Sequence, residues 1–436
     1  MLITPNPLAE TATALHNDQL NLVAYINEIC ERIDTIESLI AALLPEPERR
    51  SRLIADAIAL QERFPDPANR PPLYGIPVGV KDMFRVDGFP TRAGSRLPPE
   101  LFAGPEADCV RALREAGALI LGKTISTEFA FFEPGPTRNP YNPAHTPGGS
   151  SSGSAAAVAA GYCPLALGTQ TIGSTIRPAA FCGIVGFKPS YGHISTAGLI
   201  KCAASVDTVG FFTQDVAGIA TVAPLLCHDW QTITDSQPLP EPVLGVPDGP
   251  YLAQASAEGL AAFEKQLALL TNAGYRVRRM SAMRDIEAIN ARHMRMVSAE
   301  MAQVHVDWFA QYAPLYRPRT AEAIREGQRV SAEELSEYRA GRLLLRQGLE
   351  QLMQQNGIDL WVCPSAPGPA PEGIKTTGNS IMNLPWTHAG LPAISLPAGC
   401  AENGLPLGLQ CIGAYMADEH VVFWAERLAH AISPSV

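Results

Sequence analysis

Lysine is scarce in this chain of 436 residues, because only six of its 33 basic residues are lysines. The 43 acidic residues outnumber the basic ones, which gives a formal net charge of −10. Such an acidic balance disfavours a surface for nucleic acid or for an anionic membrane, so we expect neither as a partner. A lysine that lies inside an apolar segment therefore stands out.

The sequence also lacks the spacings that hold metals or disulfides. Its nine cysteines are scattered without a Cys-x-x-Cys pair, and no His-x-x-x-His or His-Glu-x-x-His pattern occurs. We expect buried free thiols in a reducing compartment, with no metal and no cofactor. There is no apolar run of about 20 residues and no N-terminal signal peptide, which predicts a cytoplasmic protein without a membrane span.

Short apolar runs follow an all-helical start. Apolar residues recur at helical spacing over 22–40, and a second helix is predicted over 48–64, before a proline cluster. From 73 to 212, short apolar runs such as 76–80 and 118–121 are separated by glycine, proline and serine. These runs predict buried strands that alternate with short helices in a parallel or mixed sheet.

The C-terminal half carries a long helical stretch and then returns to strands. Helices are predicted over about 256–356 apart from a strand at 275–278, and strands follow at 359–363 and 393–397. A last helix is expected over 418–432.

We therefore predict an α/β fold with a single large domain, in which a central mixed β-sheet is flanked by helices. An N-terminal helical segment occupies 1–70 and the α/β domain occupies 71–436. Within that domain, a helix-rich variable insertion is expected at about 220–356.

Residues 117–124 fit the phosphate-binding pattern Gly-x-x-x-x-Gly-Lys-[Ser/Thr]. A phosphate loop must be flexible and must direct several N–H groups at its ligand. Here Ala-Leu-Ile-Leu at 118–121 is a strand sequence, and no helix start follows it. We therefore predict a core strand and no nucleotide site.

Residues 149–153, Gly-Ser-Ser-Ser-Gly, fit the nucleophile elbow of α/β-hydrolases, which would make Ser151 the nucleophile. An elbow needs a strand immediately before it, and three prolines between 140 and 147 disfavour one. Neither His388 nor His420 lies in a distinctive context for a triad. We therefore do not expect an elbow.

A third pattern combines segments around Lys81, Ser150 and Ser174. Lys81 follows an apolar run, and burial would lower its pKa toward a neutral amine that acts as a base. Ser150 lies in a Gly/Ser-rich loop, where glycines allow close approach. Gly173 and Ser174 precede a helix start, so their N–H groups are placed to bind a developing oxyanion.

Each of these segments alone also has a plain structural interpretation. Lys81 could be a strand-end lysine that reaches solvent. The Gly/Ser run could be a flexible loop, and Ser174 could cap the following helix.

Together the three segments resemble the amidase signature family of serine amidohydrolases. The resemblance covers about 20–215 and 358–432, and the stretch at about 220–356 carries little of it. Further matching segments are 135–142, 179–189, 205–210, 390–397 and 404–410.

The resemblance implies a Ser–cis-Ser–Lys triad. Ser174 would be the nucleophile, Ser150 the bridging serine and Lys81 the base, with a cis peptide bond between Gly149 and Ser150. The nucleophile would form an acyl-enzyme that water hydrolyses. The implied oxyanion hole is made by the backbone N–H groups of Thr171, Ile172, Gly173 and Ser174.

Two departures from the family pattern concern the substrate site. Ile172 stands where the family usually has glycine, so this position has either an ordinary φ or an altered oxyanion hole. Gln170 replaces the usual aspartate, and Arg177 lies three residues after Ser174. Both features resemble malonamidase-like amidases, in which the corresponding arginine binds a substrate carboxylate.

The expected substrate is therefore a small amide, with Arg177 binding a carboxylate and with Gly149 and Ser151 also in contact. The alternative role of Arg177 is structural, at the helix start. Specificity is expected from helices over 285–350 and from loops around 131–132 and 376–382.

Three functions follow from the resemblance. The first is a free-standing amidase that cleaves linear C–N bonds other than peptide bonds. The second is an A-subunit-like component of an amidotransferase, or of a hydrolase complex with a small partner; Gln170 and Arg177 argue against it. The third is a non-catalytic binding protein, supported only by Ile172. Assembly as a homodimer or with a small accessory protein is a family-level expectation.

Overall fold

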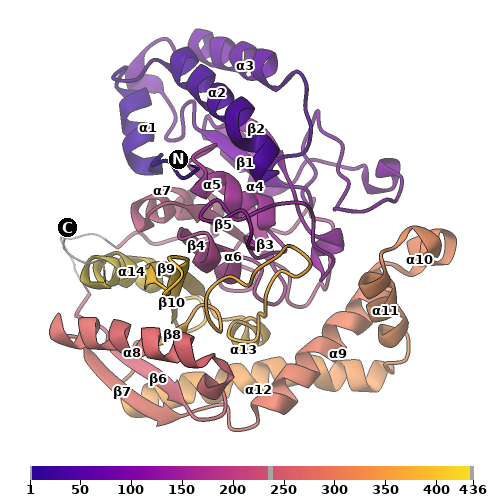
Figure 1. The fold of residues 1–436 in the computed structure, drawn as a ribbon, viewed down its shortest axis with the longest axis vertical. Coiled ribbons are helices and arrows are strands. Elements are labelled where there is room, and N and C mark those ends of the chain that lie inside the picture. Colours follow the sequence, from indigo (N-terminus) through magenta and orange to yellow (C-terminus); the bar gives the residue numbers. More distant parts are fainter. Residues whose placement is uncertain (1, 234–238, 433–436) are drawn as a thin grey trace.

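The computed structural model describes residues 2–233 and 239–432, and its centre is one ten-stranded sheet (Figure 1). The strands lie in the order β2-β1-β3-β5-β4-β9-β10-β8-β6-β7. Their bounds are β1 Pro77–Lys81, β2 Leu119–Thr124, β3 Leu165–Gln170, β4 Val185–Lys188, β5 Thr208–Thr213, β6 Val243–Asp248, β7 Arg276–Ser281, β8 Leu360–Pro364, β9 Ala393–Cys400 and β10 Pro406–Ile412. The predicted fold class, a single large α/β domain with a central mixed sheet, is confirmed.

The strand directions divide the sheet into a centre and two ends. β2, β1 and β3 run parallel at one end, and β8, β6 and β7 run parallel at the other. The strands between them pair antiparallel. Because β1 and β3 are parallel neighbours, their last residues, Lys81 and Gln170, lie at the same edge of the sheet.

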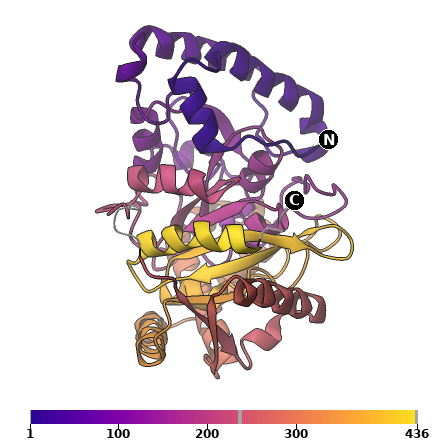
Figure 2. The ribbon, with the colours of Figure 1, turned by 90° about the vertical axis from the view of Figure 1, so that its left-hand side faces the viewer.

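Helices cover the sheet on both faces and at both ends. In Figure 1, α1 to α3 lie at the end of β1 and β2, and α8, α9 and α12 lie at the end of β6 and β7. α14 packs on β9 (Figure 2). None of the helices within 2–233 and 239–432 is long and apolar enough to span a membrane. The helices are α1 Leu8–His16, α2 Leu22–Ile40, α3 Arg49–Arg63, α4 Asp108–Glu115, α5 Ser152–Ala159, α6 Ile176–Phe181, α7 Val216–Leu226, α8 Ala257–Asn272, α9 Ile286–Val304, α10 Val306–Tyr312, α11 Pro318–Gly327, α12 Ala332–Asn356, α13 Leu384–Ala389 and α14 Asp418–Ile432.

Most of the elements predicted from sequence are confirmed. α2, α3 and α14 match the predicted helices, and β1, β7, β8 and β9 match predicted strands. The phosphate-loop pattern falls on β2, which is buried throughout, so it is a core strand as predicted. β6 and β10 were not predicted, because glycine and proline interrupt both strands and weaken their apolar pattern.

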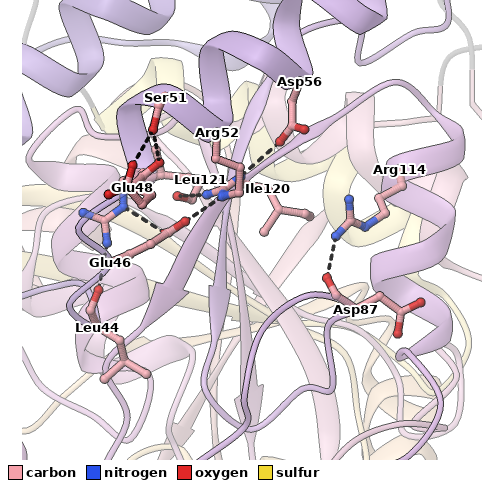
Figure 3. A network of polar contacts seen from close by, with 11 residues as sticks. Leu44, Glu46, Glu48, Ser51, Arg52, Asp56, Asp87, Arg114, Ile120 and Leu121 are labelled. Atoms are coloured by element: carbon pink, nitrogen blue, oxygen red, sulfur yellow. Dashed lines mark hydrogen bonds and ion pairs between the residues drawn. The ribbon is translucent and has the colours of Figure 1, made fainter.

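Arg52 fixes α3 to the edge strand β2 (Figure 3). Its guanidinium donates to the carbonyl oxygens of Ile120 at 2.9 Å and Leu121 at 3.1 Å. The same group forms ion pairs with Glu46 at 2.6 Å and Asp56 at 3.1 Å. One side chain therefore joins the N-terminal helices to the sheet.

α5 is a helix of small residues that lies directly against the sheet, and all of its residues are buried. A Cβ atom on Gly153 would lie 2.2 Å from the carbonyl oxygen of Ala42 and 2.4 Å from the backbone nitrogen of Ile125, so only glycine fits. Ser154 Oγ donates to the carbonyl oxygen of Leu167 at 2.8 Å. This close packing fixes the loop that precedes α5.

A buried polar cluster holds the start of α14. Asp418 accepts hydrogen bonds from the N–H of Ser190 at 2.7 Å and from its hydroxyl at 2.6 Å. His193 Nδ1 lies 3.2 Å from Asp418 Oδ2, and His193 Nε2 donates to the carbonyl oxygen of His228 at 2.7 Å. Burial alone would lower the pKa of His193, but the Asp418 carboxylate, the His228 carbonyl and Glu419 together outweigh it, so the pKa is raised.

The variant His193→Gln should lower the free energy of unfolding by about 1–3 kcal/mol at pH 6, because it removes a buried charged partner of Asp418. The stabilisation from His193 is complete below its unfolded-state pKa of about 6.5 and is lost as the pH rises through the higher folded-state value. Denaturant unfolding from pH 5.5 to 9 should therefore show that the difference in the free energy of unfolding between wild type and His193→Gln becomes smaller as the pH rises.

His420→Gln supplies the control over the same pH range, because His420 is exposed and lies outside the buried cluster around Asp418. A difference for His193→Gln that stays constant over this pH range would contradict the raised pKa.

Candidate active site

Lys81 ends β1 and is fully buried. Its Nζ lies 2.7 Å from Ser150 Oγ, 3.0 Å from Ser151 Oγ and 2.7 Å from Thr169 Oγ1. The two serines come from the loop before α5, and Thr169 comes from the neighbouring strand β3. The structure thus brings Lys81 and Ser150 together, as the sequence predicts, and excludes the solvent-exposed alternative for Lys81.

The environment of Lys81 favours the neutral amine. Burial removes water from the ammonium group and lowers the pKa of Lys81 to about 7, while Cys202 and Asp207 act weakly in the opposite direction. Within the described chain Lys81 forms no ion pair. Near neutral pH, the neutral and charged forms therefore both occur.

The loop before α5 has the cis peptide bond between Gly149 and Ser150 that the resemblance implies. Gly149 has no room for a side chain, because a Cβ atom there would lie 2.6 Å from Thr377 Cγ2. Ser151 is fully buried, and its hydroxyl is held by the backbone of Thr169 as well as by Lys81. Contact of Gly149 and Ser151 with a substrate stays a prediction.

The turn between β3 and α6 is shaped by Gln170. Its Oε1 accepts hydrogen bonds from the N–H groups of Thr175 at 2.8 Å and Ile176 at 3.0 Å. Its Nε2 donates to Thr387 Oγ1 at 2.9 Å. The side chain of Gln170 therefore closes a loop around residues 171–174.

The N–H groups of the four expected oxyanion donors, Thr171, Ile172, Gly173 and Ser174, have no acceptor within the described residues. Ile172 does not have a positive φ, so the ordinary backbone conformation, one of the two outcomes predicted for this position, is observed. Gly173 is packed so tightly that a Cβ atom would lie 2.4 Å from Asn383 Oδ1. The turn thus presents unpaired N–H donors beside Ser174, as an oxyanion hole requires.

Arg177 connects this turn to the Ser150 loop. The side chain is 2% exposed, and Nη2 donates to the carbonyl oxygen of Gly149 at 2.5 Å and to Thr377 Oγ1 at 3.1 Å. Nε and Nη1 are buried without a hydrogen-bond partner, and no carboxylate of the described chain pairs with the guanidinium. Burial lowers the pKa of Arg177 to about 9.

A family model for amidases matches residues 24–422 of this chain. The chain belongs to the amidase family.

Known proteins resemble this amidase over nearly its whole length. The A subunit of the glutamyl-tRNA(Gln) amidotransferase of Synechococcus sp. (strain WH7803) is 32% identical, over 97% of this chain and 96% of its own. A crystal structure of an amidase is 32% identical with a TM-score of 0.89, and the match covers 98% of this chain and all of that one. A chain from a vestigial protein complex linked to the origins of an s-triazine catabolic enzyme is 26% identical, with a TM-score of 0.87 and coverage of 98% for both chains.

The amidase has a pocket of 640 Å³, whose lining includes none of Lys81, Ser150, Ser174 and Arg177. Its lining comes from Phe132, from Asn290 and Met294 of α9, and from the loop over 376–381. Ser380 of this loop packs against Gly173. The structure thereby brings together the segments that the sequence predicted to carry specificity. No group of three or more metal-binding side chains occurs in the part of the chain that the structure describes.

Several residues around the turn were missed by the sequence analysis. Thr387 and Asn383 of the α13 region contact Ile172 and Gly173, and His293 of α9 contacts Thr171. These contacts join residues more than a hundred positions apart, and no local motif marks them. His388 was considered only as a triad member, which it is not.

Proposed function

We propose that this amidase hydrolyses the C–N bond of a small amide that carries a carboxylate, through an acyl-enzyme on Ser174. The observation that carries the proposal is the buried guanidinium of Arg177, which has two unpartnered nitrogens and no carboxylate partner in the described chain. A buried charge without a counter-ion is costly, and a substrate carboxylate would supply both the charge and the hydrogen-bond acceptors.

The proposed proton path starts at Lys81. In its neutral form the amine has a lone pair, which can accept the hydroxyl proton of Ser150 at the observed distance of 2.7 Å. Ser150 in turn takes the hydroxyl proton of Ser174, whose oxygen attacks the amide carbonyl. The N–H groups of the turn at 171–174, from Thr171, Ile172, Gly173 and Ser174, bind the oxyanion that develops on the carbonyl oxygen.

Collapse of this intermediate breaks the C–N bond. The leaving nitrogen takes back a proton along the same path and departs as ammonia or an amine, which leaves the acyl group on Ser174. Water then adds to the acyl carbonyl and gives up a proton to the path. The products are a carboxylic acid and the regenerated Ser174 hydroxyl.

A second candidate is an A-subunit-like component of an amidotransferase. The full-length similarity to amidotransferase A subunits supports this candidate more than it supports a free-standing enzyme. The sequence pattern of Gln170 and Arg177 was expected to argue against this candidate. The buried guanidinium of Arg177 fits both candidates, however, because glutamine, the ammonia donor of such systems, is itself an amide that carries a carboxylate. A non-catalytic role is disfavoured, because a binding protein has no chemical need for Lys81, Ser150 and Ser174 together.

Ammonia release from pairs of amides with and without a carboxylate tests the proposal. Malonamate, succinamate and glutamine should be turned over, and Ser174→Ala should abolish all turnover. Arg177→Met should raise KM for these substrates by about 10–100-fold, the loss expected for a charge-assisted bond, and leave KM for the neutral amides unchanged. An equal effect on neutral amides would refute carboxylate binding by Arg177.

The pH dependence of nucleophile reactivity tests Lys81. A fluorophosphonate probe reacts when Ser174 Oγ bonds to phosphorus and fluoride and a proton leave. The labelling rate should rise with pH through about 7 and then level off, because the neutral form of Lys81 is the base. Lys81→Met should reduce the plateau by about 100-fold or more. A flat profile from pH 5.5 to 8.5 would exclude Lys81 as the titrating base.

The activity of the isolated chain, compared with its activity in a complex, distinguishes a free-standing amidase from an A-subunit-like component. A free-standing amidase should hydrolyse the panel as the purified chain alone. An A-subunit-like component should be labelled by the probe yet release little ammonia from glutamine. Its glutamine turnover should rise about tenfold or more when the remaining subunits of an amidotransferase co-elute with it in size exclusion. Full activity of the isolated chain would rule out the second candidate.

A further inference from the structure

Three consecutive peptide groups in the turn at 171–174 have their carbonyl oxygens occupied. His293 Nε2 donates to the carbonyl oxygen of Thr171 at 3.1 Å, and Thr387 Oγ1 donates to that of Ile172 at 2.7 Å. The N–H of Arg177 donates to the carbonyl oxygen of Gly173 at 3.0 Å. The N–H groups on the other side of these same peptide units belong to Ile172, Gly173 and Ser174.

This arrangement affects the N–H groups through the rigidity of the peptide. A peptide unit is planar, so a hydrogen bond that fixes its carbonyl also fixes the direction of its N–H. A donor at the carbonyl oxygen also polarises the unit and makes its N–H a stronger donor. The bond from His293 to Thr171 therefore acts on the N–H of Ile172.

His293 is itself oriented by a second histidine. Its Nδ1 lies 3.2 Å from Nδ1 of His388, and both side chains are fully buried. A carbonyl oxygen can only accept, so the proton of neutral His293 is on Nε2 and its Nδ1 is the acceptor. His388 must then donate from its Nδ1, which leaves His388 Nε2 unprotonated, and that atom has no partner in the described structure.

The pair is uncharged in the folded protein. Burial lowers the pKa of His293 to about 3 and that of His388 to about 2, and the nearby cation of Arg342 acts in the same direction. The pair therefore fixes one tautomer, with the chain of donors running from His388 through His293 to the carbonyl oxygen of Thr171. It cannot act as a proton acceptor in the reaction at ordinary pH.

We propose that His293, held by His388, is a positioning residue that orients and polarises the peptide group between Thr171 and Ile172 for oxyanion binding. The inference rests on the proposed function, in which the N–H of Ile172 is an oxyanion donor. His293 lies between Asn290 and Met294 on α9, and both of these line the pocket. The same helix thus borders this pocket and contacts the turn at 171–174.

Fluorophosphonate labelling tests this role without knowledge of the substrate. His293→Phe keeps a ring of similar size but removes the donor, and kinact should fall by about tenfold while the probe KI stays unchanged. This loss is smaller than the 100-fold or more expected when an oxyanion donor is removed outright, because His293 acts through the peptide. His293→Gln places an amide N–H near the position of Nε2 and should restore kinact to within about threefold of wild type.

His305 provides a matched control, since it is another fully buried histidine close to the end of α9. Its contacts are with Tyr316 and the aromatic rings of Phe129 and Trp308, away from the turn at 171–174. His305→Phe should leave kinact unchanged. Thermal unfolding of each variant shows whether it is folded.

The possible outcomes distinguish a failure of the positioning role of His293 from a failure of the proposed function. Equal slowing by His293→Phe and His305→Phe, an unchanged rate for His293→Phe, or a His293→Gln rate as low as that of His293→Phe would each overturn the positioning role. Failure of wild type to label, or equal labelling of Ser174→Ala, would instead overturn the proposed function.

Discussion

The burial of Lys81 is the constraint on which the rest of the site depends. An amine removed from water needs polar partners, and here three hydroxyl groups from two chain segments supply them. This requirement fixes the loop of Ser150 and Ser151 against β1 and β3. The small residues of α5 allow that loop to approach, because Gly153 lets the helix lie almost in contact with the backbone of Ala42 and Ile125.

Several cationic side chains of this amidase are buried, and they differ in their ion-pair and hydrogen-bond partners. Lys123 has an ion pair with Asp82 at 3.0 Å, whereas Lys188 donates to the carbonyl oxygens of Pro189 and Leu391. Arg177 has only two of its possible bonds. A buried cation whose donors are all paired stabilises the fold, whereas a buried cation with unpaired donors, such as Arg177, is suited to an anionic ligand.

The sequence predicted the parts of the fold and site that are encoded locally. The periodicity of α2 and the apolar run of β1 each reflect what one segment buries, and Lys81, Ser150 and Ser174 lie in recognisable motifs. His293 and Thr387 could not be found in this way, because their role depends on which carbonyl of the distant turn they contact. β6 and β10 were missed for another reason, since β-sheet pairing overrides the low strand propensity of glycine and proline.

The two edges of the sheet are protected by different means. At β2, the carbonyl oxygens of Ile120 and Leu121 are occupied by Arg52, and the N–H of Leu44 donates to the carbonyl oxygen of Lys123 at 2.8 Å. At β7, three of the exposed positions carry arginines, Arg276, Arg278 and Arg279, whose charge discourages the approach of a further strand. Edge-to-edge aggregation is thereby opposed at both ends of the sheet. A protein that assembles with this chain is therefore expected to dock on its helices or loops, because β2 is occupied by other groups and β7 is charged.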